Sequence, residues 1–186
     1  MESILTDLIT LTRLSEPDYQ VLRDHQAQTQ LWGSDIVKEF YDTLYAYERT
    51  AKIFKEGERQ TRETALGQWY MEITSGNYPQ DFWHRQWVIG LVHISQQVTN
   101  PFMLAMISRM QQTFLKKCLQ TYPPAEAEQV FLSFKRVTDV IAGLIAEGYF
   151  VNYISAMEQV GGLRLSLVQR MIDLEIKKKL AKIKQK

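Results

Sequence analysis

The sequence predicts an all-α protein. Apolar residues recur at helical spacing through most of the chain, as in Val37, Phe40, Tyr41 and Leu44, which occupy positions i, i+3, i+4 and i+7. Helix start signals and Gly/Pro/Asn clusters divide the chain into segments, and no segment alternates polar and apolar residues as a half-buried strand does. We therefore expect roughly six to eight helices and no sheet.

The first three helices are expected before residue 48. The first covers residues 3–13. The run Ser15-Glu16-Pro17-Asp18 combines an N-cap serine, a first-turn proline and an acidic residue at the capping-box position. These signals predict a second helix to about residue 31, and a corner at 32–35 then opens a third helix to residue 47.

Breaker clusters define the later helices. A helix over 60–74 ends at Ser75-Gly76-Asn77-Tyr78-Pro79. Residues 80–95 are helical again, and Thr99-Asn100-Pro101 opens a long helix over 101–120. A Pro-Pro loop at 122–124 precedes a second long helix over 125–160, which Gly161-Gly162 ends.

Composition limits the class of protein. Hydrophobic residues make up 45% and charged residues 23% of the 186 residues, which suffices for the core of one domain and argues against wholesale disorder. The net charge of +1 produces no overall field that would attract nucleic acid. Nucleic acid is therefore not an expected partner.

The small net charge hides a basic C-terminal segment. Residues 163–186 carry eight Lys or Arg and two acidic residues, a net +6, which leaves −5 for residues 1–162. We therefore expect a main domain over 1–162 and a basic tail over 163–186. An apolar stripe predicts that the tail is an amphipathic helix, whose contact is an acidic membrane surface, a partner, a second copy or only solvent. The stripe consists of Leu165, Val168, Ile172, Ile176, Leu180 and Ile183.

Cysteine content and the N-terminus bear on the compartment. Cys118 is the only cysteine, which excludes an intramolecular disulfide and a cysteine-based metal site. Residues 1–14 mix acidic with apolar residues and lack the basic start of a signal peptide. No apolar run reaches the length of a membrane span. We therefore expect a cytoplasmic protein.

One of the three histidines differs from the other two. His25 lies in a polar stretch and His84 near a helix start, so both are expected at the surface. His93 lies in an apolar run, one turn after Ile89 and Gly90. Two interpretations are open from these residues alone: a core histidine with a satisfied N–H, which is commoner, or an iron ligand in haem, which needs such an apolar wall. The small Gly90 would let a flat macrocycle approach the backbone.

Aromatic and methionine side chains leave the same two interpretations open. Phe40-Tyr41 is consistent with ordinary core, but a buried tyrosine hydroxyl needs a hydrogen-bond partner, and bound O₂ is one such partner. Other residues of this kind would line either a core or a macrocycle. They are Phe54, Trp69, Met103, Met106, Met110 and Phe150.

Four segments in order resemble the sensor-globin family, which comprises protoglobins and the globin domains of globin-coupled sensors. They are LSEPDYQVLRDH; IVKEFYDTLY, with its Phe-Tyr pair; WYMEITSGNYPQDFWHRQWVIGLVH, with a Ser/Thr-Gly-x-Tyr turn and an Ile/Val-Gly-x-x-His run; and FLSFKRVTDVIAGLIAEGYFVNYI. Each motif alone is unspecific, but the ordered set, over about residues 14–157, is specific. The resemblance implies a globin fold.

The resemblance also implies a haem b cofactor that binds O₂ reversibly, with CO or NO as other diatomic ligands. By position, His93 is similar to the proximal iron ligand, and Tyr41 to the distal tyrosine that donates a hydrogen bond to the bound gas. The helix with Arg62, Ala65 and Leu66 would cover the distal side, and which of these three faces the iron is open. The remaining haem contacts would be Phe40, Trp69, Ile89, Gly90 and Met106.

Two kinds of partner follow from the resemblance. The family's last two long helices pair in a homodimer, which would use helices 101–120 and 125–160, with Gly143 and Gly148 allowing close helix approach. Sensor relatives continue into an output domain, and this sequence holds no GGDEF-like, kinase-like or methyl-accepting segment. We therefore expect that any signal passes to a partner protein.

One departure and three alternatives qualify the resemblance. Gln97 and Thr99 stand where the family commonly has Gly and Pro, so the turn beneath the haem is expected to differ. A haem-less interaction module in stress signalling is the main alternative function. An enzyme for NO dioxygenation or peroxidase-like chemistry is disfavoured, because no reductase or flavin-binding segment is present. A helical bundle without haem is the third alternative, and we expect a gas-binding protein rather than an enzyme.

Overall fold

The computed structural model describes residues 1–162 and 164–184, and every regular element among them is a helix. The helices are α1 (Glu2–Thr12), α2 (Glu16–Thr29), the 3-10 helix η1 (Gln30–Trp32), α3 (Gly33–Ala46), α4 (Glu48–Ala51), α5 (Arg59–Thr74), α6 (Phe82–Ser95), α7 (Asn100–Thr121), α8 (Pro124–Gly161) and α9 (Leu165–Ile183). The predicted all-α fold is confirmed over these residues.

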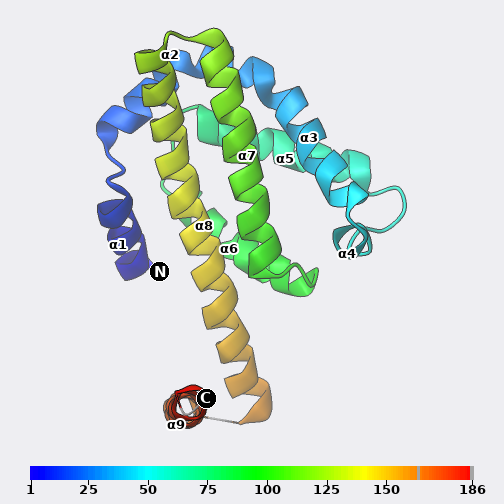
Figure 1. The fold of residues 1–186 in the computed structure, drawn as a ribbon, viewed down its shortest axis with the longest axis vertical. Coiled ribbons are helices and arrows are strands. Elements are labelled where there is room, and N and C mark those ends of the chain that lie inside the picture. The colour runs from blue at the N-terminus through cyan, green and yellow to red at the C-terminus, as the bar shows by residue number, and fades with distance from the viewer. Residues whose placement is uncertain (163, 185–186) are drawn as a thin grey trace.

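Helix α8 is the centre of the arrangement. Figure 1 shows α7 and α8 side by side along the molecule, and α1, α2 and α6 also pack against α8. Side chains in the middle of α8 are fully buried, among them Val137, Val140, Ile141 and Leu144. By length and composition α8 would pass as a membrane span, so the expectation that no segment does was wrong. Of its most apolar 18-residue window, 33% is buried inside the protein.

The predicted start of α2 is confirmed and has a second role. Asp18 Oδ2 accepts a hydrogen bond of 2.9 Å from the Ser15 backbone N–H, which completes the capping box. Its other oxygen, Oδ1, accepts hydrogen bonds from Ser133 Oγ at 3.1 Å and from Arg136 Nη1 at 2.6 Å. The buried carboxylate of Asp18 therefore both caps α2 and joins it to α8.

The short helix α4 was not predicted. It is a single turn, which is too short for a periodic pattern to reveal. Thr50 holds it against the end of α3, because its hydroxyl donates a 2.5 Å hydrogen bond to the carbonyl oxygen of Leu44.

Two glycines that the sequence assigned to other roles bring α6 and α8 together. A Cβ added at Gly90 would lie 2.6 Å from the Ile145 carbonyl oxygen, and one added at Gly148 would lie 2.5 Å from the Trp87 carbonyl oxygen. The prediction that Gly90 lets a macrocycle approach was therefore wrong, because its bare face is covered by the backbone of α8. Gly148 likewise packs within the chain, and a Cβ at Gly143 would meet Leu8 of α1 at 2.5 Å.

His25 was predicted to lie at the surface, but the structure places it in a partly buried position. Its Nε2 lies 3.0 Å from Glu126 Oε1, its Nδ1 lies 2.7 Å from the carbonyl oxygen of Val21, and its ring contacts the edge of Tyr122. The polar sequence around His25 did not reveal that the start of α8 lies over it. His84 is exposed, as predicted.

The predicted helix in the basic tail is confirmed as α9, which lies across the far end of α8 (Figure 1). Leu163, the first residue of the predicted tail, and Gln185 and Lys186 lie outside the described residues. Four residues of the predicted stripe are exposed, namely Ile172, Ile176, Leu180 and Ile183. The domain division at residue 162 and the contact of the tail with a membrane, a partner or a second copy stay predictions.

Substitution of Gly90 by alanine tests the close approach of α6 and α8. The added methyl group would force the two backbones apart, so we expect the free energy of unfolding to fall by about 1–3 kcal/mol. Gly67→Ala is the matched control, because a Cβ at this helical glycine would lie 4.0 Å from Val37, an ordinary contact. The control should raise stability by up to about 1 kcal/mol. Equal urea midpoints for Gly90→Ala and the unsubstituted protein would contradict the close packing.

Candidate functional site

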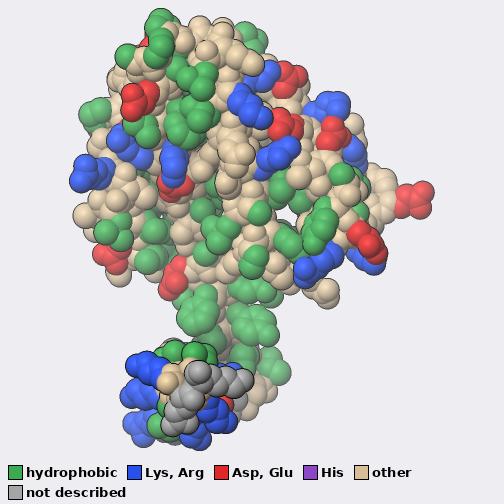
Figure 2. All heavy atoms as spheres, viewed as in Figure 1, with side chains coloured by type: hydrophobic (Ala, Val, Ile, Leu, Met, Phe, Trp, Pro, Cys, Tyr) green, Lys and Arg blue, Asp and Glu red, His purple; other side chains and the backbone are tan. Residues whose placement is uncertain are grey.

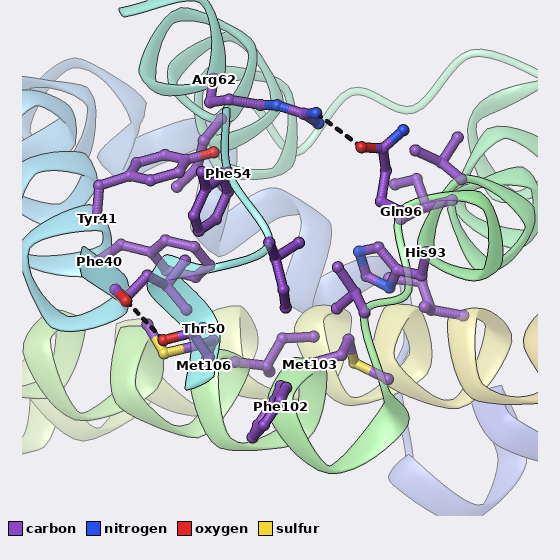
Figure 3. A pocket seen from close by; sticks show the side chains of 18 of the residues that line it. Phe40, Tyr41, Thr50, Phe54, Arg62, His93, Gln96, Phe102, Met103 and Met106 are labelled. Carbon is purple, nitrogen blue, oxygen red and sulfur yellow. Dashed lines mark hydrogen bonds between the residues drawn. The ribbon is translucent and has the colours of Figure 1, made fainter. Parts of the chain in front are cut away.

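A cavity of about 230 Å³ lies between α3 and α4 on one side and α6 on the other, with α5 and α7 closing its remaining walls (Figure 3). Apolar side chains form most of the lining. Six of the seven residues that the sequence predicted as cofactor contacts line this cavity. They are Phe40, Tyr41, Trp69, Ile89, His93 and Met106. The structure thus brings them together, and their contact with a cofactor stays a prediction.

Other residues that the sequence suggested as cofactor contacts differ in whether they line this cavity. Gly90 is absent from the lining because it faces α8. Phe150 is 55% exposed and lies outside the cavity, so it lines neither core nor cofactor site. On α5, Arg62 and Leu66 line the cavity, whereas Ala65 is exposed. The structure therefore narrows the open choice on the distal helix to Arg62 and Leu66.

His93 presents a neutral imidazole to the cavity. Burial lowers the pKa of its ring below the ordinary value, so the uncharged form is favoured. Its Nδ1 is buried, and no hydrogen-bond partner for it is found among the described residues. A buried ring nitrogen without a partner costs stability in the protein alone. A neutral imidazole of this kind is a good ligand for a transition metal.

The turn that follows His93 explains how α6 ends without glycine. The backbone N–H of Val98 donates to the His93 carbonyl oxygen at 2.9 Å, and that of Gln97 donates to the Ile94 carbonyl oxygen at 3.1 Å. This pattern is a Schellman motif, which requires a left-handed residue. Gln97 supplies it with a φ of 57°. Glycine, which the resembling family commonly has here, would adopt this conformation with less strain. Gln97 therefore makes the same turn at a higher conformational cost.

Tyr41 points into the cavity from α3, opposite His93 (Figure 3). Burial raises the pKa of its phenol to about 12, and the nearby positive charge of Arg62 only partly offsets this effect. Its ring packs edge-on against Phe40 and Phe54, with centroid distances of 5.4 and 5.9 Å. The hydroxyl is therefore fixed in direction and protonated at neutral pH, so it is a hydrogen-bond donor.

Sequence inspection missed Gln86, which fixes one wall of the cavity. Its Oε1 accepts a 2.8 Å hydrogen bond from Trp69 Nε1, and its Nε2 donates to the Phe82 carbonyl oxygen at 3.1 Å. Because Gln86 is almost fully buried, this pair ties α5 to α6 inside the protein. A glutamine between Arg85 and Trp87 gives no signal of such a role in the sequence.

Arg62 lies at the mouth of the cavity. Its Nη2 donates a 3.2 Å hydrogen bond to Oε1 of Gln96, the residue that caps the C-terminus of α6, and lies 3.3 Å from Oε2 of Glu58, the N-cap residue of α5. Figure 3 shows the guanidinium group reaching from the Tyr41 side of the cavity toward the His93 side. Among the described residues that line the cavity, Arg62 is the one with a formal charge.

Comparison with known proteins identifies the family. The family model named Protoglobin matches residues 1–155 of the sequence. The chain belongs to the protoglobin family. No curated protein matches the sequence of this protoglobin.

Two solved structures resemble this protoglobin. The globin domain of a globin-coupled sensor from Geobacter sulfurreducens gives a TM-score of 0.72 at 18% identity, covering 77% of this chain and 96% of that one. The globin domain of E. coli DosC in a ferric form gives 0.62 at 15% identity, covering 78% and 98%. At these identities the likeness shows the fold, so the predicted globin fold is confirmed.

Membership of the protoglobin family implies a haem cofactor, and the residues of the cavity fit one. The walls are apolar, as a macrocycle requires. The neutral imidazole of His93 faces the phenol of Tyr41, and no group of three or more His, Cys, Asp or Glu among the described residues could hold a bare metal ion. His93 can supply one ligand to an iron whose other in-plane ligands the ring itself provides.

Proposed function

We propose that this protoglobin binds haem b through His93 and reversibly binds O₂, with CO and NO as further ligands, as a gas sensor that acts on a partner protein. The observation that carries the proposal is the placement of His93 and Tyr41 on opposite sides of one apolar cavity (Figure 3). Membership of the protoglobin family rests on the family match and is consistent with the fold.

Four residues that line the cavity have distinct roles in this function. The bound haem supplies the iron that coordinates a diatomic gas. His93 holds the cofactor from the α6 side and leaves the Tyr41 side open to the gas. Tyr41 Oη donates a hydrogen bond to the gas ligand, and Phe54 and Leu66 keep water away from it. This set of groups binds and releases a ligand without an acid–base pair for chemical turnover, which favours binding over catalysis.

The main alternative is a haem-less interaction module. A module without haem has no use for a buried histidine whose Nδ1 lacks a partner, because an apolar residue there would be more stable. The presence of both His93 and Tyr41 in the cavity therefore supports haem binding over that alternative.

Haem binding by His93 is tested by absorption spectroscopy of the purified full chain supplied with haem. We expect a Soret band that shifts on reduction and again on addition of O₂ or CO. His93→Ala should weaken haem binding by more than about tenfold, and added imidazole should restore it. The control is His84→Ala, since His84 is exposed and lies outside the cavity. A protein without a Soret band would support the haem-less module, and an unchanged His93→Ala spectrum would remove His93 as the ligand.

The hydrogen bond from Tyr41 is tested by the rate of O₂ release. One such bond is worth roughly 1–3 kcal/mol, so Tyr41→Phe should release O₂ about 10–100 times faster in stopped-flow displacement by CO. Tyr45→Phe is the control: Tyr45 is one turn further along α3, its hydroxyl is also buried, and it does not line the cavity. An unchanged rate in Tyr41→Phe would reject its role as donor.

We also infer a homodimer that uses the free end of α8. Exposed apolar side chains follow one another there at spacings of three, four and three residues, which is the pattern of a helix that pairs with another helix. They are Phe150, Tyr153, Met157 and Val160, with 55, 50, 41 and 91% exposure. Figure 2 shows apolar side chains gathered on this part of the molecule, between the globular body and α9. Gly143 and Gly148 take no part, because both face other helices of the same chain.

The dimer is tested by light scattering after size exclusion. The full chain should have the mass of two copies, and the double substitution of Tyr153→Lys and Met157→Lys should give one copy, because like charges would face each other across the pair. Leu31→Lys is the control, since Leu31 is 71% exposed but lies on η1 and is not part of the exposed apolar end of α8. A dimer that survives the double substitution would place the interface elsewhere.

A further inference from the structure

The hydrogen bond between Arg62 and Gln96 spans the mouth of the cavity. It joins α5, which carries the distal residue Leu66, to α6, which carries His93. A flat ligand held between Tyr41 and His93 would have its edge beneath this bond (Figure 3). Arg62 therefore lies where the rim of such a ligand meets solvent, with its side chain 31% exposed.

The guanidinium of Arg62 is only partly satisfied by its neighbours. It has five N–H donors, and the structure pairs one nitrogen with Gln96 at 3.2 Å and with Glu58 at 3.3 Å. Gln96 is a neutral acceptor, so this bond is weaker than one to a carboxylate. Glu58 lies outside the cavity lining and also accepts a bond from the Lys55 backbone N–H at 3.4 Å. The side of the guanidinium that faces the cavity is thus available to an anion.

A second observation places this charge over the cavity rather than in bulk solvent. The Arg62 charge acts on the buried phenol of Tyr41 and opposes the rise of its pKa. The guanidinium therefore lies close to the distal half of the cavity. A cation at the rim of an otherwise apolar cavity favours a ligand that is apolar in its body and anionic at one edge.

We propose that Arg62 selects the acidic edge of the ring ligand: its guanidinium binds a carboxylate at the rim of the macrocycle and exchanges Gln96 for it. This inference rests on the proposed haem function and adds a residue that decides which ring is accepted. A guanidinium and a carboxylate form two parallel hydrogen bonds, which a neutral ester cannot match. The cavity thus distinguishes a ring with free carboxylates from the same ring with esterified ones.

The test compares two metal-free rings of the same shape, protoporphyrin IX and its dimethyl ester, titrated into the full chain after removal of any bound pigment. Binding is followed by porphyrin fluorescence and by quenching of the tryptophan fluorescence, to which Trp69 in the cavity lining contributes. The diacid should bind about 10–100 times more tightly than the ester. In Arg62→Gln the diacid should weaken to the affinity of the ester, whose own binding stays unchanged, and Arg62→Lys should restore part of the preference.

Arg59→Gln is the matched control. Arg59 lies on the same helix, is paired with Asp42 at 2.5 Å and Glu63 at 2.7 Å, and does not line the cavity. It should keep the full preference for the diacid. Thermal unfolding of each variant, followed by circular dichroism, establishes that it is folded before binding is compared.

The outcomes separate this inference from the proposed function. Equal binding of diacid and ester, or a preference that survives Arg62→Gln, would overturn the role of Arg62 while ring binding stands. Failure of both rings to bind would overturn the haem function and this inference with it. Sodium acetate provides a third arm: a saturable change of the tryptophan fluorescence on addition of acetate alone, lost in Arg62→Gln, would assign Arg62 to a free anion instead of the ring.

Discussion

The contact between the backbones of α6 and α8 is the constraint on which the cavity depends. At Gly90 and Gly148 the two helices approach so closely that neither position has room for a Cβ. This contact fixes both the position of α6 and its rotation about its own axis. His93 follows Gly90 by three residues, so its side chain projects from the neighbouring face of the helix, where the cavity lies. The direction of the imidazole is thus a consequence of helix packing rather than of any hydrogen bond to its ring.

The opposite wall is held by polar links between its lining side chains and the surrounding helices. Trp69 and Gln86 join α5 to α6, and Thr50 closes α4 onto the end of α3. Trp69 and Thr50 line the cavity, but each of their donors is already paired, with Gln86 Oε1 and with the Leu44 carbonyl oxygen. The lining itself can therefore stay apolar and leave the Tyr41 hydroxyl as its directed donor. The apolar lining keeps water away from the site, and the paired polar groups hold the surrounding helices together.

The sequence was sufficient for features that depend on near neighbours in the chain and insufficient for those that depend on distant ones. The capping box at Ser15, the breaker after α5 and the helical spacing around Tyr41 are local, and each was predicted. Six cavity residues also followed, because the resemblance supplied their tertiary arrangement. Gly90 was misassigned, since a glycine in a helix does not reveal which neighbour covers it. Gln86 and the link from Arg62 to Gln96 were missed for the same reason: their partners lie 17 and 34 residues away.

Three costly features meet around the end of α6 and the start of α5. His93 has a buried nitrogen without a partner, Gln97 holds a left-handed conformation that suits glycine, and Arg62 places a charge at the rim of an apolar cavity. Features of this kind lower stability in the protein alone and are expected where binding requires them. A ligand with a metal, an apolar body and an anionic edge would use the imidazole of His93 and the charge of Arg62 together. Binding of such a ligand and stability of the fold are therefore linked, because the ligand stabilises only the folded arrangement that brings these groups into one cavity.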